Sequence, residues 1–232
     1  MNNKRIADLQ RALIDHNLDA YYLNSCDYHL SEYVAAYFRT IEYFAGFTGS
    51  VSTLIVDREK AYIFVDGRYH IQAQQECTPN GVEVIRLGTE GALEPEDFLA
   101  ENYKEKLIGL DGKRTSIAFV RKLQAKGLKI RSLDIYSRLI ENRAPLSKDK
   151  LKELEIEYTG LSRKAKLDNV RYCLGGKVHI INNLESIAYL LNLRGNDIAC
   201  TPVFMSFMVF YEDDVYFFID VNRCKAETLD SL

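Results

Sequence analysis

The chain contains two copies of one sequence pattern, and this internal repeat limits its possible folds more than any other feature. The stretch Thr40–Gly49 matches Ser186–Gly195 at an offset of 146 residues, with a Thr/Ser-Ile-x-Tyr-Phe/Leu pattern ahead of a glycine in each. The stretch Ala61–Asp66 matches Val215–Asp220 at an offset of 154 residues. One insertion of eight polar and small residues accounts for the difference. The repeat predicts two tandem units with the same fold.

Each copy alternates helical and strand-like segments. In the first copy, the amphipathic stretch of residues 4–16 precedes a short apolar strand at Ala20–Leu23. Val51–Val56 and Ala61–Val65 are rich in β-branched and aromatic residues and enclose a polar turn, which is typical of a hairpin. The order in both copies is helix, strand, short helix, glycine turn, hairpin, aspartate and helix. The sequence therefore predicts an α/β fold.

A polar segment that contains a proline, ENRAPLSKDK at residues 141–150, is the expected linker between two domains. The first domain is then residues 1–143 and the second is residues 150–232. Further strand and helix patterns follow the hairpin of the first domain, and the second has no equivalent of them within the sequence, so we expect the second domain to be incomplete. Its strand Val215–Ile219 is apolar on both faces, and we expect another copy of the chain to cover it.

Composition argues against several classes of partner. The formal net charge is −3 over 232 residues, so neither nucleic acid nor an anionic membrane is an expected partner. No apolar run approaches the roughly 18 residues of a membrane span, and the charged N-terminus is unlike a signal peptide. The five cysteines form no CxxC pair, which indicates reduced thiols and a cytoplasmic protein.

Motifs for catalysis or metal binding are missing from the sequence. The four histidines are not spaced as helical pairs, and neither HExxH nor a paired-cysteine motif is present. There is no G-x-S-x-G motif and no phosphate-binding loop, and the glycines of FAGFTGS precede a hairpin rather than a helix. The residues therefore predict no catalytic site, no metal site and no bound cofactor in this chain.

The DGRY motif at Asp66–Tyr69 admits two interpretations. Arg68 could bind a carboxylate as a bidentate fork, with Asp66 orienting it. Alternatively, Asp66 ends a strand and caps a helix that begins at Gly67. Asp220 occupies the matching place in the second copy, after an unrelated loop, so the structural role as a cap is the favoured prediction for both aspartates.

Two other polar segments have both a functional and an ordinary interpretation. Ser31-Glu32-Tyr33 could line a polar cleft or form an ordinary loop. In the segment NLRGND, Arg194 and Asp197 lie on a glycine turn, from which they could reach a substrate or a neighbouring domain. The favoured prediction is that these two side chains pair with each other.

Four motifs in a fixed order, SEY, FTGS, DGRY and LLNLRGND, resemble the N-terminal region of three-domain Xaa-Pro aminopeptidases. These enzymes belong to the creatinase/prolidase superfamily, peptidase family M24, and the resemblance covers nearly the whole chain. It implies two tandem creatinase/prolidase-N-like units, each a mixed β-sheet flanked by helices, with the second apparently truncated.

The resemblance also implies an activity for the longer parent protein. In this family a third domain binds two divalent metal ions, usually manganese, through two Asp, one His and two Glu. The metal ions activate the water that attacks the carbonyl between the first residue and a proline. None of those ligands falls within residues 1–232, so this chain by itself is expected to be inactive.

By position, the resemblance makes five residues candidates for inter-domain contact or substrate access: Glu32, Arg68, Tyr69, Arg194 and Asp197. The implied partners are the chain's own C-terminal catalytic domain, a second copy in a homo-oligomer, and the peptide substrates of the parent enzyme. The alternative hypothesis is a stand-alone binding or regulatory module without catalytic activity.

Overall fold

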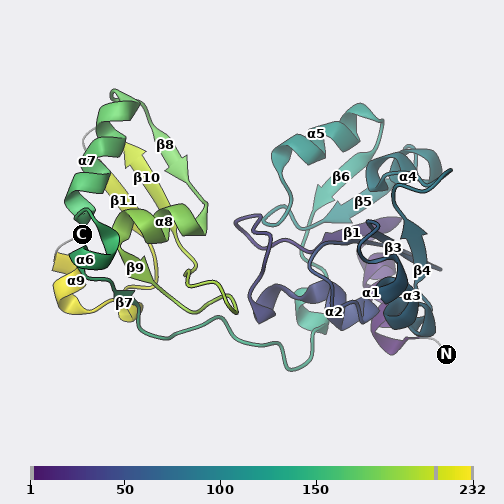
Figure 1. Cartoon of the computed structure of the whole chain (residues 1–232). Coiled ribbons are helices and arrows are strands. Elements are labelled where there is room, and N and C mark those ends of the chain that lie inside the picture. The colour runs from purple at the N-terminus through teal and green to yellow at the C-terminus, as the bar shows by residue number, and fades with distance from the viewer. Residues whose placement is uncertain (1–2, 212–213, 231–232) are drawn as a thin grey trace. The chain divides into compact units, whose positions relative to one another are not determined.

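The computed structural model describes residues 3–211 and 214–230, and the chain divides between Ala144 and Pro145 into two compact units (Figure 1). We call Met1–Ala144 the first unit and Pro145–Leu232 the second unit. Every helix within the described residues is too short or too polar to cross a bilayer.

The first unit is built on a six-stranded sheet with the order β4-β3-β2-β1-β5-β6. The strands are β1 (Ala20–Asn24), β2 (Thr53–Asp57), β3 (Ala61–Val65), β4 (Glu83–Arg86), β5 (Leu107–Leu110) and β6 (Lys129–Ser132). β2 is antiparallel to both of its neighbours, whereas the pairs β1–β5, β5–β6 and β3–β4 are parallel. The predicted α/β fold with a mixed sheet is confirmed for this unit.

Helices cover both faces of this sheet. The helices are α1 (Lys4–Asp15), α2 (Thr40–Ala45), α3 (His70–Cys77), α4 (Pro95–Asn102) and α5 (Ile117–Ala125), with short 3-10 helices η1 (Ala36–Phe38), η2 (Thr78–Asn80) and η3 (Ser137–Leu139). Leu9 of α1 and Phe44 of α2 pack with Leu54 in one core cluster. Leu99 of α4 and Leu123 of α5 pack in another, on the opposite face. Successive side chains of a strand point to opposite faces of the sheet, so the apolar residues of the strands contribute to two cores, one on each face.

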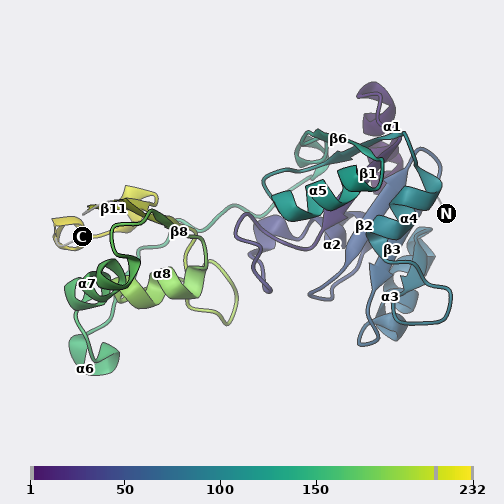
Figure 2. The same cartoon turned by 90° about the horizontal axis from the view of Figure 1, so that it is seen from above.

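The second unit has a smaller main sheet of three antiparallel strands in the order β11-β10-β8. These are β8 (His179–Ile181), β10 (Phe207–Tyr211) and β11 (Asp214–Phe218), and a separate pair joins β7 (Lys152–Glu153) to β9 (Leu193–Arg194). The helices are α6 (Ile156–Thr159), α7 (Arg163–Leu174), α8 (Leu184–Leu191), α9 (Ala226–Asp230) and the 3-10 helix η4 (Val221–Arg223). Figure 2 shows α7 and α8 together on one side of the strands.

The register of the strands follows the repeat seen in the sequence. Leu54 pairs with Ile63 in the first hairpin, and Met208 pairs with Phe217 in the second, which keeps the offset of 154 residues on both strands. β1 pairs antiparallel with β2 just as β8 pairs antiparallel with β10. The order β11-β10-β8 therefore reproduces the order β3-β2-β1, and the second unit repeats half of the first unit's sheet.

Candidate functional site

The first unit gathers polar side chains at one edge of its sheet. Because β2 alone runs against the other strands, the carboxyl ends of β1, β3, β4, β5 and β6 lie at the same edge. That edge is where open α/β sheets bind ligands. The loop that carries Glu32 follows β1, and the DGRY turn follows β3. We call Glu32, Ser50, Asp66, Arg68 and Tyr69 the polar ledge.

Asp66 and Arg68 form a bidentate ion pair on this ledge. The Nε of Arg68 donates to Oδ1 of Asp66 at 3.0 Å, and its Nη2 donates to Oδ2 at 2.8 Å. The backbone N–H of Arg68 also donates to Oδ1, at 3.0 Å. These hydrogen bonds from Arg68 lower the pKa of Asp66 to about 2. The pair is fixed in direction but open to solvent, since the Arg68 side chain is 62% exposed.

The prediction that Asp66 caps a helix beginning at Gly67 is wrong. Helix α3 begins at His70, and its N-cap position is occupied by Tyr69 without a side-chain cap. The chain first makes a turn, closed by the N–H of Tyr69 and the carbonyl of Asp66 at 2.9 Å. A capping side chain must directly precede the helix to reach its first amides, and Asp66 lies too far upstream. Its carboxylate closes the turn instead.

Asp220 makes the equivalent contact in the second unit and does stand directly before a helix. Its Oδ1 accepts from the N–H of Asn222 at 3.1 Å, at the N-cap of η4. Asp66 and Asp220 thus both accept the N–H two residues ahead, at positions related by the 154-residue offset.

Tyr69 is held in place by a hydroxyl and by an aromatic neighbour. Its OH lies 2.8 Å from the Oγ of Ser50, and its ring packs edge-on against Phe47 with centroids 5.5 Å apart. A Cβ on Gly49 would lie 2.3 Å from the Phe47 ring, so this packing requires a glycine between Phe47 and Ser50. The glycine of FTGS therefore shapes an aromatic contact rather than a phosphate loop.

Glu32 belongs to the same electrostatic neighbourhood. The carboxylate of Asp66, chiefly through its hydrogen bonds, raises the pKa of Arg68, and Glu32 adds to this effect. The Arg68 guanidinium also lies 5.2 Å from the centroid of the Tyr69 ring. The structure thus places two of the first-unit candidates, Arg68 and Tyr69, in contact, whereas Glu32 acts on Arg68 only as a nearby charge beyond ion-pair distance. An exposed guanidinium with its paired carboxylate forms a surface for polar contact, and no side chain of the ledge is a nucleophile activated by a base.

Arg114, which the sequence analysis did not single out, anchors the loop that carries Glu32. This buried guanidinium donates to the carbonyl of Cys26 at 2.6 Å and to that of Phe38 at 2.9 Å, at the two ends of the loop. It also donates to the OH of Tyr136 at 3.1 Å, which in turn donates to Asp111 at 2.7 Å. The one signal in the sequence is an arginine shortly after Asp111, the aspartate that directly follows β5.

The second-unit candidates are engaged within that unit. Asp197 forms a buried bidentate pair with Arg223, with N–O distances of 2.8 and 2.5 Å. The predicted pairing of Asp197 with Arg194 is therefore wrong. Arg194 instead donates through Nη1 to the carbonyl of Ala188 at 2.8 Å, near the end of α8, and to the carbonyl of Leu193 at 2.9 Å. Asp197 pairs with Arg223 because η4 places the Arg223 guanidinium inside the unit. A buried Asp197 carboxylate without a cationic partner would destabilise the fold.

The main sheet of the second unit carries an exposed apolar face. Met208 and Phe210 of β10 point to the covered face and are buried. Ile180 and Tyr216 both pair with Val209, which lies between Met208 and Phe210 on β10, so their side chains point to the other face. On that face Ile180 is 65% exposed and Tyr216 is 48% exposed. We call Ile180, Tyr211, Tyr216 and Phe218 the open sheet face.

The first unit shows what covers the equivalent face there. At the 154-residue offset, Tyr216 and Phe218 correspond to Tyr62 and Phe64. These two side chains pack in one core cluster with Leu99 of α4 and Leu123 of α5. The open sheet face thus has the same apolar character as a face that is buried under two helices elsewhere in the same chain.

The donor set of the described residues does not fit a metal centre. Among residues 3–211 and 214–230, no group of three or more His, Cys, Asp or Glu side chains is placed to hold a metal ion. A dinuclear centre needs several such ligands around a small volume.

Comparisons with known proteins agree over the whole chain. Two models of the creatinase/prolidase N-terminal domain match it, one over residues 5–142 and the other over residues 142–232. A "Probable Xaa-Pro aminopeptidase P" of Talaromyces stipitatus is 33% identical over 97% of this chain and 36% of its own length. "Xaa-Pro aminopeptidase 1" of Dictyostelium discoideum is 28% identical over 99% of this chain and 39% of its own length.

A solved structure gives the same result. The X-prolyl aminopeptidase of Caenorhabditis elegans, described as a cytosolic enzyme with a di-nuclear active site, superimposes with a TM-score of 0.91 at 25% identity. The match covers 98% of this chain and 40% of the Caenorhabditis elegans chain. The chain thus spans roughly two fifths of the proteins that it matches.

Proposed function

This chain belongs to the creatinase/prolidase N-terminal domain family, and from that premise we propose that it is the non-catalytic N-terminal region of a metal-dependent Xaa-Pro aminopeptidase. Such an enzyme removes an N-terminal residue that precedes proline. The family predicted from the four sequence motifs is confirmed. The observation that carries the proposal is the match of almost the entire chain to part of the Caenorhabditis elegans enzyme.

Catalysis and metal binding are assigned to residues outside this chain. In this proposal the catalytic domain of the parent enzyme holds two divalent metal ions, and manganese is the proposed metal. The support is the di-nuclear active site of the Caenorhabditis elegans enzyme, together with the donor set described above, which does not fit such a centre. The chain by itself then cleaves no Xaa-Pro peptide.

The polar ledge is assigned to contact with the catalytic domain and to the access of peptide substrates. Its exposed Arg68 is held in a fixed direction by Asp66, and Tyr69 is held by Ser50, so the ledge presents oriented polar groups at low entropic cost. Glu32 lies in a loop tied at both ends by Arg114. Arg194 and Asp197 contribute by fixing the second unit internally.

The open sheet face is assigned to packing against another chain segment or copy. Because the face is apolar and exposed, residues 1–232 studied by themselves form a homo-oligomer through the second unit. Neither nucleic acid nor membrane is a partner in this proposal, and the protein acts in the cytoplasm, as the Caenorhabditis elegans enzyme is described to do.

A chimera tests the proposal. The matching region of the Caenorhabditis elegans enzyme is replaced by this chain, and release of the first residue from an Xaa-Pro peptide is measured with Mn²⁺ present. We expect the chimera to be active, the rest of that enzyme alone to be impaired, and this chain alone to be inactive. A folded but inactive chimera would favour the alternative, a stand-alone binding or regulatory module. Cleavage by this chain alone would overturn the assignment of catalysis to other residues.

A further inference from the structure

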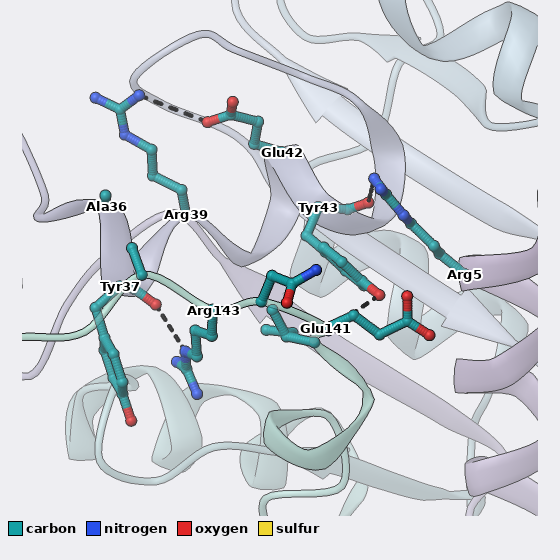
Figure 3. A pocket seen from close by; sticks show the side chains of 11 residues that line it. Arg5, Ala36, Tyr37, Arg39, Glu42, Tyr43, Glu141 and Arg143 are labelled. Carbon is teal, nitrogen blue, oxygen red and sulfur yellow. Dashed lines mark hydrogen bonds and ion pairs between the residues drawn. The ribbon is translucent and has the colours of Figure 1, made fainter.

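A pocket of 330 Å³ in the first unit lies where α1, η1 and α2 meet the segment that follows η3 (Figure 3). Three arginines line it: Arg5 from α1, Arg39 at the start of α2, and Arg143 near the end of the unit. None of them belongs to the polar ledge.

Two of these arginines have no acidic partner among residues 3–211 and 214–230. Arg39 lies 3.6 Å from Glu42, which neutralises it in part. Within the part of the chain that the structure describes, neither Arg5 nor Arg143 forms an ion pair with a carboxylate. Cations without a counter-charge on the wall of one pocket favour an anionic ligand.

Both unpaired guanidiniums are nevertheless fixed in position. Arg5 donates through Nη1 to the carbonyl of Tyr43 at 2.9 Å and lies 4.2 Å from the centroid of the Tyr43 ring. Arg143 donates through Nε to the carbonyl of Tyr37 at 2.9 Å and lies 3.6 Å from the Tyr37 ring. Each guanidinium has five N–H donors, so most of them stay free for a ligand. Fixed donors lose little rotamer entropy on binding.

The placement of the two guanidiniums limits the shape of the ligand. Figure 3 shows Arg5 and Arg143 on either side of Tyr43, and each guanidinium packs on a different ring, that of Tyr43 for Arg5 and that of Tyr37 for Arg143. A compact ion would contact one of the two, whereas an elongated molecule with an anionic group at each end could contact both. Apolar side chains also line the pocket, among them Ile140 and Ala144, which suits a ligand with an apolar spacer.

We propose that this pocket binds a small elongated dianion, with one oxyanion group on Arg5 and the other on Arg143. Carboxylates and phosphates share the geometry that a guanidinium fork recognises. Glu141 also lines the pocket and opposes such a ligand. Because Glu141 and Arg143 precede the boundary between the units, the ligand braces the segment that leads out of the first unit.

The test uses residues 1–232 and a series of linear α,ω-dicarboxylates from succinate to suberate, titrated at constant ionic strength and followed by calorimetry. Affinity should pass through an optimum with chain length, and monocarboxylates of the same lengths should bind at least roughly tenfold more weakly, since one charge-assisted contact is lost. α,ω-Bisphosphonates of matched length show whether phosphorus oxyanions are preferred. Equal affinity for mono- and dicarboxylates, or no binding of either dianion series, would overturn the proposal.

Three variants separate this site from general attraction of anions. Arg5→Gln, on an exposed helix surface, should lower affinity roughly tenfold and abolish the optimum in chain length. Glu141→Gln should raise affinity. Arg121→Gln removes the same charge from an exposed position on α5 and should change nothing. If Arg121→Gln weakened binding as much as Arg5→Gln, the attraction would be non-specific and the site refuted.

A second readout does not depend on heat changes. Trypsin cleavage after Arg143 should slow when the best dicarboxylate is added to the natural sequence. The same ligand should give no protection in Arg5→Gln. Protection that persists in Arg5→Gln would contradict a ligand held between the two arginines.

Discussion

Arg114 donates a hydrogen bond of 2.6 Å to the backbone carbonyl of Cys26, a residue 88 positions earlier in the chain. A second bond reaches Phe38, so one buried side chain closes the loop that carries Glu32. The loop therefore owes part of its shape to a residue that lies far away in the sequence, in addition to the buried Asp27 carboxylate inside the loop, which accepts the N–H groups of His29 and Ser31.

Replacing Arg114 should loosen that loop and destabilise the first unit. Arg114→Ala leaves several buried carbonyls without a donor, and we expect a loss of about 2–4 kcal/mol in the free energy of unfolding. Urea unfolding measures the loss, and hydrogen exchange should show faster exchange in residues 25–39. Arg121→Ala, at an exposed position on α5, should change the stability by less than about 0.5 kcal/mol. Equal effects of the two changes would show that Arg114 is not an anchor.

The ion pair between Asp66 and Arg68 predicts a dependence of stability on pH. The pKa of Asp66 lies at about 2 in the folded protein, below its ordinary value of 3.8. The ionised carboxylate therefore stabilises the fold above about pH 4, and this stabilisation is lost as the pH falls through 2. Asp66→Asn can still accept the N–H of Arg68, so it removes the charge and keeps the turn.

The difference in unfolding free energy between the natural sequence and Asp66→Asn should therefore shrink steadily from pH 5 to pH 2. Because both side chains are partly exposed, the difference should also shrink in 1 M salt. Urea unfolding over this pH range measures it. A difference that stays constant with pH would mean that the carboxylate charge does not contribute.

The buried pair of Asp197 and Arg223 should matter far more than a surface pair. The two side chains are 1% and 4% exposed, so removing either one strands a buried charge. Asp197→Ala or Arg223→Met should each cost about 3–5 kcal/mol in the unfolding free energy of the second unit. The exposed pair of Lys164 and Asp168 supplies the control, with an expected coupling of about 0.3–0.5 kcal/mol.

A double-mutant cycle distinguishes the pairs. Strong coupling between Asp197 and Arg223, and none between Asp197 and Arg194, is the expected result. Coupling of Asp197 to Arg194 instead would restore the pairing that the sequence favoured.

These residues show which parts of the structure a single sequence could predict. The hairpins and their repeat follow from local alternation of apolar residues, which fixes strand pairing and register. Glu32 follows β1, and Arg68 and Tyr69 follow β3, so the order of the strands places all three at the same edge of the sheet.

The errors arose where a contact joins distant residues or where two local motifs look alike. The partner of Asp197 lies 26 residues away, and no periodic pattern marks it. Asp66 resembles a helix cap because an aspartate that closes a turn accepts the same kind of backbone N–H. The pocket with Arg5 and Arg143 joins residues from opposite ends of the first unit, so the linear sequence gave no sign of it.

The open sheet face predicts self-association through the second unit. Ile180, Tyr216 and Phe218 expose large apolar surfaces, whereas the equivalent residues in the first unit are packed under α4 and α5. Residues 1–232 should therefore form a dimer or larger species, and residues 1–144 should remain a folded monomer. Light scattering of both, over a range of concentrations, measures this.

Single charges locate the contact. Tyr216→Glu and Phe218→Glu place a carboxylate on the open sheet face and should shift residues 1–232 toward the monomer, because burying an unpaired charge is costly. Ile71→Glu makes a comparable change at a 76% exposed apolar residue of the first unit and should leave the association unchanged. If residues 1–232 were monomeric at every concentration, the face would not drive association. If Ile71→Glu dissociated the complex and Phe218→Glu did not, the contact would lie on the first unit and not on the second.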